Sequence, residues 1–321
     1  MEARGDDEGD GQGAVDRRGA PIPRRQAAGP PSRENRPWQE AHLLRARVRE
    51  LERRCAALEA AEQQTAALNA GLLVELEETN RGVVALYQHE HQLALTLQRT
   101  FLPAVLPSVA HMSLAVRYLA ADPGNEIGGD FYEAVSTPEG LLLAVGDVAG
   151  HNLQAAVMMG ELRHALRAYA YDGHSPRAIV SRLDRLLRLT RPGRTATVCV
   201  ALVDLTTGTL RFANAGHLPP LLAFAGAAPH YVHEHGPLLG LGLPQPPETT
   251  VHLTPGARLL MVTDGLIEAP GTHLDDSLEQ LRSVVANAPA DGEAFCDALL
   301  DAFRHHRQDD VVVFSAEFTG G

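Results

Sequence analysis

The sequence predicts an α+β protein in which antiparallel sheets are covered by pairs of helices and preceded by one long helix. β-Like runs form two clusters in the C-terminal two-thirds of the chain, and helix-like segments form two pairs. This order is not the regular strand–helix alternation of a parallel sheet. Before the first strand, the stretch from Gln39 to Leu102 lacks Pro and is dominated by Glu, Arg, Leu, Ala and Gln, which favour helix.

The first segment, residues 1–37, is rich in Gly, Pro, Arg, Asp and Glu and has few apolar side chains. Such a segment cannot bury enough surface to offset the entropy lost on ordering, so we expect a disordered tail. It has no apolar stretch typical of a secretory signal. No run in the chain reaches the ~18–20 apolar residues that span a bilayer. Three scattered cysteines fit a reducing compartment, and we therefore expect a cytoplasmic protein with no membrane association.

The overall charge argues against one class of partner. The chain of 321 residues carries a net charge of −12, and non-specific nucleic-acid binding needs a basic surface. A local basic stretch, RRGAPIPRRQ, lies near the N-terminus. With 45% apolar residues, the chain can form a sizeable core. We expect no nucleic-acid partner.

The second segment, residues 38–102, shows heptad spacing over about eight heptads. One interpretation is a single amphipathic helix packed on its own domain. We favour a parallel coiled coil that makes a homodimer, with polar positions that fix or shift its register. The spacing is carried by two ladders of apolar residues, Leu44, Leu51, Leu58, Leu72, Leu86 and Leu93 on one and Val48, Cys55, Leu76, Val83 and Leu97 on the other; Thr65 and Thr79 interrupt the first, and Glu62, Asn69 and Glu90 occupy polar slots of the second.

The third segment, residues 103–321, is the globular domain, and Pro103 and Pro107 end the long helix before it. Amphipathic helices are predicted at about 153–171, 175–189, 276–286 and 293–305. Strands are predicted in the runs MSLAVRYLA, GGDFYEAV, GLLLAVGDV, TATVCVALVDL, GTLRFANAG, PPLLAFAG and ARLLMVTDG and in the last run from Asp310 to Phe318.

Acidic residues lie at the ends of several of these strands. Asp130 follows Gly128-Gly129, Asp147 follows LLLAVG, Asp264 follows LLMVT, and Asp309-Asp310 precede VVVF. Strand ends that are far apart in sequence can converge in a sheet, and clustered carboxylates suit Mg²⁺ or Mn²⁺. Taken singly, each residue has a simpler interpretation: Asp147, for example, would cap the helix that follows it. Four such acids in one domain are hard to explain as turns.

Two histidines accompany these acids, His151 in the Asp147 loop and His217 in FANAGHLPP. Either residue could act as a general acid or base, or could be a satisfied polar residue of a loop. The sequence has no HExxH pair, no GxxxxGK[ST] loop and no GxSxG turn, which argues against a histidine-zinc site, a P-loop nucleotide enzyme and a nucleophile elbow.

The motifs EIGGDFYEAV, LLLAVGDVAGHNLQAAVMMGEL, TATVCVALVDLTTGTLRFANAGHLPPLL, GPLLGLG, LLMVTDGLIEA and QDDVVVF resemble the SpoIIE-type branch of the metal-dependent serine/threonine protein phosphatases (PPM family). They follow the family's order over about residues 105–318. The segment ending in LALTLQRTFLP is similar to the regulatory linker of RsbU-like phosphatases. The resemblance implies an α-β-β-α sandwich of two antiparallel sheets flanked by helix pairs.

The resemblance also implies a site for two Mn²⁺ or Mg²⁺ ions. Asp147 would bridge both ions, the carbonyl of Val148 would complete one of them, and Asp264 and Asp309 would hold the other. Asp130 would reach the first ion through a water or directly. Asp309 is favoured over Asp310 because the family's ligand is the first of its acidic pair. Such ions activate a water for in-line attack on phosphorus, and His151 or a bound water would protonate the leaving alkoxide.

The sequence departs from the family pattern at Glu133, Asn152 and Val312, and none of these residues is an implied ligand. The implied activity is dephosphorylation of phosphoserine or phosphothreonine in a phosphorylated STAS-type anti-anti-sigma protein. An upstream regulatory protein would act through the long helix. Two alternatives remain: a dimeric adaptor that binds a phosphoprotein without hydrolysing it, and a phosphatase acting on small molecules, for which no glycine-rich phosphate loop is present.

Overall fold

The structure is a computed structural model that describes residues 36–103, 105–120, 128–150, 153–268, 271–304 and 309–320. The chain divides into two compact units, Met1–Asn80 and Arg81–Gly321. Helix α1 (Arg36–Phe101) contributes to both units. Nearly all of the predicted disordered tail, residues 1–35, lies outside the described residues. No helix in the described ranges is long and apolar enough to cross a membrane.

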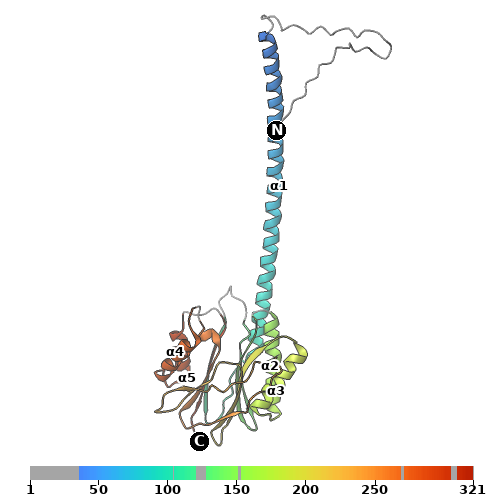
Figure 1. Ribbon diagram of the computed structural model, residues 1–321. Coiled ribbons are helices and arrows are strands. Elements are labelled where there is room, and N and C mark those ends of the chain that lie inside the picture. The colour runs from blue at the N-terminus through green and yellow to red at the C-terminus, as the bar shows by residue number, and fades with distance from the viewer. Residues whose placement is uncertain are drawn as a thin grey trace, which may run out of the picture. The chain divides into compact units, whose positions relative to one another are not determined.

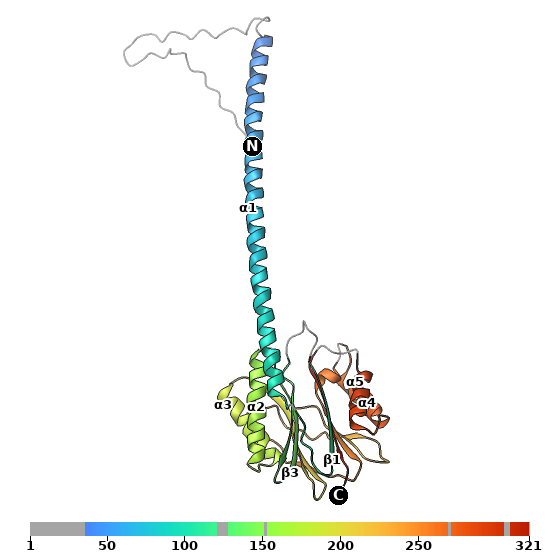
Figure 2. The same ribbon diagram turned by 180° about the vertical axis from the view of Figure 1, so that it is seen from behind.

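The second unit contains two five-stranded antiparallel sheets that face each other (Figure 2). The first sheet has the order β2-β3-β4-β5-β8, and the second has the order β1-β10-β9-β6-β7. The strands of the first sheet are β2 (Phe131–Thr137), β3 (Gly140–Val148), β4 (Ala196–Asp204), β5 (Thr209–Ala215) and β8 (Thr249–His252). Those of the second are β1 (Met112–Leu119), β6 (Leu221–Ala223), β7 (His230–Tyr231), β9 (Ala257–Val262) and β10 (Val311–Phe318).

Helices cover the outer face of each sheet (Figure 1). The first sheet carries α2 (Leu153–Tyr171) and α3 (Pro176–Thr190), and the second carries α4 (Leu274–Ala286) and α5 (Gly292–Ala302). The expected α-β-β-α sandwich preceded by a long helix is therefore confirmed. A 3₁₀ turn, η1 (Asp264–Leu266), follows β9.

Strand β3 shows why the apolar runs are continuous. Side chains alternate between the two faces of a strand. Leu142 and Ala144 pack in the core with α2 and α3, whereas Leu141, Leu143 and Val145 pack in the core between the two sheets. Because both faces are buried, the strand reads as LLLAV instead of alternating apolar and polar residues. A third core joins the second sheet to α4 and α5.

Most predicted elements of the domain match the structure, and the differences occur at their ends. α2 spans the predicted residues, and α3 starts at Pro176 and ends at Thr190. α5 ends at Ala302 rather than at residue 305, which lies outside the described residues. β10 begins at Val311, so Asp310 precedes the strand. The short strands β7 and β8 were not predicted, because two to four residues of mixed polarity carry no periodic signal.

Helix α1 exposes the apolar ladder that predicts a coiled coil. Leu51 and Leu58 are 51% and 70% exposed, and Leu72 is 54% exposed. The interrupting Thr65 and Thr79 donate their hydroxyls to the carbonyls of Ala61 and Glu75, each at 2.8 Å. The threonines thus satisfy their polar groups within the helix. The exposed ladder is the surface that a second helix would cover.

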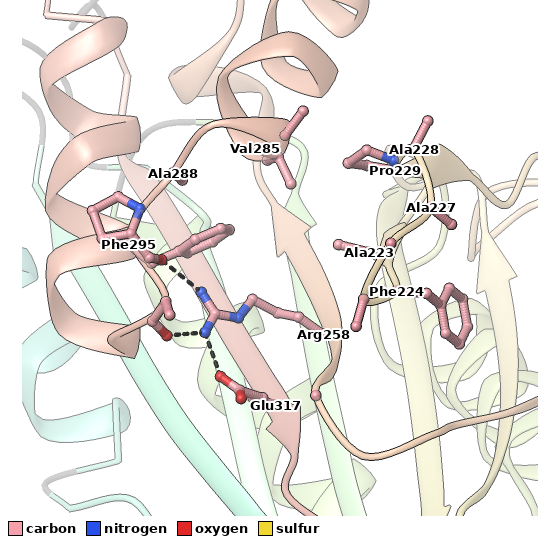
Figure 3. Close-up of a pocket in the computed structure, with 16 residues that line it drawn as sticks. Ala223, Phe224, Ala227, Ala228, Pro229, Arg258, Val285, Ala288, Phe295 and Glu317 are labelled. Carbon is pink, nitrogen blue, oxygen red and sulfur yellow. Dashed lines mark hydrogen bonds and ion pairs between the residues drawn. The ribbon is translucent and has the colours of Figure 1, made fainter.

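A hollow of about 320 Å³ lies between the α4–α5 turn and the β6–β7 turn (Figure 3). Arg258 lines it, donates to the carbonyls of Pro289 and Ala290, and forms an ion pair with Glu317. Its guanidinium also lies 4.2 Å from the ring centroid of Phe295. These contacts tie the helix pair to the second sheet, and none of the acidic residues singled out in the sequence lines this hollow.

Candidate metal centre

Asp147 lies inside β3, one residue before the strand ends. It is paired in register with Thr197 of β4. The next described helix, α2, begins only at Leu153. The interpretation of Asp147 as a helix cap is therefore wrong, because the residue belongs to the sheet. Its backbone is fixed by strand pairing, which leaves its carboxylate available at the edge of the sandwich.

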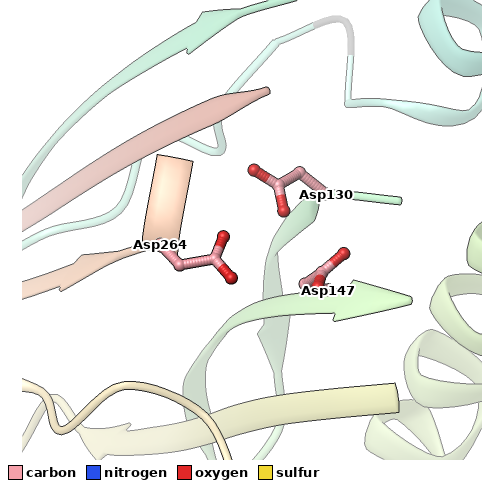
Figure 4. Close-up of side chains that lie close together, drawn as sticks. All are labelled: Asp130, Asp147 and Asp264. Atoms are coloured by element: carbon pink, nitrogen blue, oxygen red, sulfur yellow. The ribbon is translucent and has the colours of Figure 1, made fainter. Parts of the chain in front are cut away.

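Asp130 and Asp264 approach Asp147 from two other segments. Asp130 immediately precedes β2, and Asp264 begins η1 directly after β9. Each of the three side chains offers a carboxylate oxygen, and these oxygens all lie within 4.8 Å of one another (Figure 4). The cluster thus joins strand ends of both sheets, with Asp130 and Asp147 from the first sheet and Asp264 from the second.

The carboxylates destabilise one another's charge. Burial raises the pKa of Asp130 well above its ordinary range, and the neighbouring Asp147 raises it further. Burial, together with Asp264 and Asp309, raises the pKa of Asp147 to about 7. Burial, followed by Glu268 and Asp309, also raises the pKa of Asp264. Packing like charges this closely is costly unless a cation compensates them.

One atom of the cluster tests whether a cation fits. Asp130 is 2% exposed, and its Oδ2 is buried without a hydrogen-bond partner among the described residues. A buried carboxylate oxygen normally has a partner. Oxygen-only donors are those preferred by Mg²⁺ and Mn²⁺. The unsatisfied oxygen and the three converging carboxylates therefore fit a divalent cation.

The two acids that precede β10, Asp309 and Asp310, lie in different environments. Asp309 is exposed, and its Oδ1 accepts a hydrogen bond from the backbone N–H of Asp310 at 2.7 Å. Asp310 is 1% exposed and accepts a hydrogen bond from the Tyr118 hydroxyl at 2.5 Å. Asp309 lies near enough to raise the pKa values of Asp147 and Asp264, although it is not among the three oxygens within 4.8 Å. Asp310 in turn contributes to the raised pKa values of Asp130 and Asp147, so both members of the pair act on the cluster.

Glycines allow the segments of the site to approach one another. A Cβ on Gly129 would lie 2.2 Å from the carbonyl oxygen of Val148, and the Val148 N–H donates to the Gly129 carbonyl at 3.3 Å. A Cβ on Gly265 would lie 2.0 Å from the Asp310 carbonyl oxygen. Any larger residue would push these backbones apart. The structure thus places the carbonyl of Val148 against the residue that precedes Asp130.

Of the two histidines that accompany these acids in the sequence, the structure describes only His217. His151 lies outside the described residues, so its predicted role stays a prediction. His217 is 7% exposed, and its Nδ1 lies 2.9 Å from the Thr197 hydroxyl. It lines a hollow of about 170 Å³ beside Asp147 and Asp264. Desolvation lowers the pKa of His217 to about 4, so its imidazole is neutral at neutral pH.

Sequence reasoning missed three residues that support the site. The Thr263 hydroxyl accepts from the Val312 N–H at 2.9 Å and also hydrogen-bonds Asp130. Tyr118 holds Asp310, and Glu268 lines the same hollow as Asp264. Thr263 and Glu268 flank the Asp264 motif, so inspection of neighbouring polar residues would have found them. Tyr118 carries no such signal, because only strand pairing of β1 with β10 brings it near Asp310.

The comparison with protein families matches residues 137–319 to the family described as Stage II sporulation protein E (SpoIIE). The chain belongs to the SpoIIE family. The matched segment runs from β2 to β10 and includes Asp147, Asp264 and Asp309.

Two individual relatives are consistent with the assignment to the SpoIIE family. Protein IcfG of Synechocystis sp. is 26% identical over 204 residues, which cover 54% of this chain and 32% of IcfG. Phosphoserine phosphatase RsbU of Bacillus subtilis is 23% identical over 202 residues, which cover 62% of this chain and 59% of RsbU. The chain therefore spans less than two thirds of either relative.

A solved structure of the RsbU and RsbW domains of Rv1364c from Mycobacterium tuberculosis has the same fold. Its TM-score is 0.62 at 33% identity, and the match covers 68% of this chain and 62% of that chain. The fold and family expected from the sequence motifs are confirmed.

Proposed function

We propose that this chain is a metal-dependent phosphoserine/phosphothreonine protein phosphatase of bacterial signalling. The observation that carries the proposal is the cluster of Asp130, Asp147 and Asp264 with an unsatisfied buried oxygen, in a chain of the SpoIIE family. Its relative RsbU is named a phosphoserine phosphatase. The substrate that we propose is a phosphorylated STAS-type anti-anti-sigma protein.

Each residue has a part in this activity. Two Mn²⁺ or Mg²⁺ ions would be held by the carbonyl of Val148 and by the carboxylates of Asp130, Asp147, Asp264 and Asp309. Bound ions of this kind supply an activated water and neutralise charge on the phosphoryl group. Thr263 would orient Asp130 through its hydroxyl, and Gly129 and Gly265 would hold the segments at the required approach. His151 is proposed to protonate the leaving alkoxide.

The end of α1 is the proposed route of regulation. A Cβ on Gly160 of α2 would lie 2.8 Å from the ring of Phe101, so the ring packs directly on the helix backbone. Arg163 of α2 donates to the Phe101 carbonyl and forms an ion pair with Glu133 of β2. Asp130 immediately precedes β2. A movement of α1 imposed by a coiled-coil partner or an upstream protein would therefore reach the segment that carries Asp130.

The test is hydrolysis of p-nitrophenyl phosphate by the full chain with and without Mn²⁺. We expect metal-dependent turnover that falls at least 100-fold in Asp147→Ala and in Asp264→Ala, since each removes a carboxylate that would hold the ions. Asp276→Ala is the matched control, because this exposed acid lies in the first turn of α4. It should keep wild-type turnover.

The same experiment separates the proposal from the adaptor. A folded wild-type chain that binds Mn²⁺ but does not hydrolyse either p-nitrophenyl phosphate or a phosphoserine protein would favour a non-catalytic phosphoprotein-binding role. Turnover that is indifferent to Mn²⁺ and to Asp147→Ala would contradict the metal-dependent mechanism itself.

A further inference from the structure

The outer face of α2 and α3 is basic in an otherwise acidic protein. Between Leu153 and Arg194 the sequence has eight arginines and three acidic residues, whereas the whole chain carries a net charge of −12. These helices lie side by side on the outer side of the first sheet (Figures 1 and 2). Only Arg163 among the eight arginines is buried, where it pairs with Glu133. The other seven arginines are exposed or half-buried.

Contacts across the two helices define the course of this surface. Arg194 donates to Gln154 at 3.1 Å, and Arg191 pairs with Glu161 at 2.6 Å. Farther along, the guanidinium of Arg182 lies 5.7 Å from the centroid of the Tyr169 ring. Because α2 and α3 are antiparallel, these three contacts follow the seam between them in order. Arg182, Arg191 and Arg194 make these contacts, and Arg185 and Arg188 are exposed on α3 beside them. We call these five residues the arginine track.

Three members of the arginine track carry uncompensated charge. Arg182, Arg185 and Arg194 are exposed, and none has an ion pair with another described residue. In contrast, Arg188 pairs with Asp184 at 3.0 Å, and Arg191 pairs with Glu161. An exposed apolar residue, Leu189, accompanies the track at 72% exposure. Arginine beside exposed apolar surface is typical of protein interfaces.

One end of the track adjoins the candidate metal centre. A Cβ on Gly150 would lie 3.7 Å from Nη1 of Arg194. The Ala149 N–H donates to the Thr195 carbonyl at 3.1 Å, which continues the pairing of Asp147 with Thr197. Arg194 is therefore positioned beside the loop that follows Asp147. The track leads from this loop along the outer helices.

We infer that the arginine track docks an acidic surface of the phosphorylated protein substrate. The inference rests on the proposed function and adds the charge of the substrate to it. A phosphoprotein that approaches a chain of net charge −12 is repelled at long range, and a local basic surface beside the site would offset that repulsion. Such complementarity acts mainly on the encounter rate and on partner choice.

The charge balance favours an acidic protein over nucleic acid or an anionic membrane. Both of those partners are extended polyanions, and the rest of the chain would repel them beyond the limits of the track. An acidic protein surface can match the track in size and can also bury Leu189. Binding of nucleic acid or membrane is therefore an outcome that would contradict the inference.

The test measures binding without catalysis. Two fluorescein-labelled phosphoserine peptides of equal length are compared by anisotropy with the full, metal-free chain, one flanked by Asp and Glu and the other by Ser and Gln. We expect the acidic peptide to bind at least tenfold more tightly at 50 mM salt. Arg182→Glu/Arg185→Glu should remove that preference, and Arg185→Gln should reduce it about threefold. Thermal unfolding checks that each variant is folded.

Arg282→Glu is the matched control, because Arg282 lies on α4 of the other helix pair, paired with Glu279. This variant should leave both affinities unchanged. Equal affinity for the two peptides, or an equal loss in Arg282→Glu, would overturn the inference. So would loss of oligonucleotide or phosphatidylserine-vesicle binding, without loss of peptide binding, in the arginine variants. Wild-type turnover of p-nitrophenyl phosphate reports separately on the proposed function, so absence of turnover with retained peptide preference would contradict only the hydrolysis.

Discussion

The guanidinium of Arg163 lies 3.0 Å from the carboxylate of Glu133, and the two side chains are only 6% and 0% exposed. Arg163 also donates to the carbonyl of Phe101, so one side chain joins α1, α2 and β2. Burial raises the pKa of Glu133 and lowers that of Arg163, while each charge opposes the shift of the other. The pair is a mutually dependent link between the long helix and the strand that follows Asp130.

Removing one partner of this pair should be far more damaging than removing both. We expect Arg163→Met to lower the free energy of unfolding by about 3–5 kcal/mol, because it leaves the Glu133 charge buried without compensation. Arg163→Met/Glu133→Met should recover most of that loss. The control is Arg191→Met, which breaks the half-exposed pair with Glu161 and should cost about 0–1 kcal/mol. Urea unfolding measures all three, and additive losses in the double variant would contradict the coupling.

The contact of Phe101 with Gly160 predicts opposite effects for two glycine substitutions. Gly160→Ala places a methyl group within 2.8 Å of the Phe101 ring, and the overpacking should cost about 1–3 kcal/mol, more than the gain in helix propensity. Gly82→Ala in α1 meets no atom within 4 Å and should stabilise by about 0.5–1 kcal/mol. Thermal unfolding compares the two. A stabilised Gly160→Ala would show that Phe101 does not pack tightly on α2.

Substitution of the adjacent Asp309 and Asp310 should have different effects on stability and on activation by Mn²⁺. Asp309 is exposed, so Asp309→Ala should change stability by less than about 0.5 kcal/mol but raise the Mn²⁺ concentration for half-maximal turnover at least tenfold. Asp310→Ala removes a buried acceptor of the Tyr118 hydroxyl and should cost about 1–3 kcal/mol. Tyr118→Phe isolates the loss of that hydrogen bond. If Asp310→Ala alone weakened Mn²⁺ activation, the assignment of Asp309 as the ligand would be wrong.

The cluster predicts a stability that depends on both pH and metal. The pKa of Asp147 is raised from 3.8 to about 7 in the folded chain, so the folded state holds its proton more tightly than the unfolded state. The contribution of this group is fully present below about pH 4 and is lost as pH rises through 7. We expect the metal-free chain to lose on the order of 1–4 kcal/mol between pH 5 and pH 8 from this source.

A substitution and the addition of metal test whether Asp147 causes this pH dependence of stability. In the metal-free chain, Asp147→Asn should reduce the dependence of the free energy of unfolding on pH. Saturating Mn²⁺ should stabilise the wild type most at the higher pH, because cations bind deprotonated carboxylates. Thermal unfolding in EDTA and in Mn²⁺ measures both effects. A slope that persists unchanged in Asp147→Asn would assign it to another group.

The exposed ladder on α1 predicts a dimer. Leu51→Asp/Leu58→Asp places two charges on the proposed helix–helix seam and should convert the full chain from dimer to monomer in sedimentation-velocity experiments. Arg53→Asp/Glu59→Lys, which changes charges at exposed positions of the same helix segment outside both ladders, is the control and should stay dimeric. A wild-type chain that sediments as a monomer at 100 μM would contradict the coiled-coil prediction.

The sequence determined the order and type of most elements because each has a local physical signal. The continuous apolar run of β3 reflects burial on both faces, and the amphipathic patterns of α2 and α3 reflect burial on one. Asp130, Asp147 and Asp264 were also found, since each acid stands next to a glycine at the end of a recognisable strand. Their motifs identified the family.

Tertiary structure alone decided how those acids are held and supported. Strand pairing placed Asp147 within the sheet and brought Tyr118 to Asp310. The packing of α2 on β2 buried Glu133 against Arg163. Nothing in the sequence near Glu133 distinguishes it from a solvated acid, because its environment is created by residues about 30 positions away. Local patterns depend on neighbours along the chain, whereas burial, ion pairing and pKa shifts depend on neighbours in space.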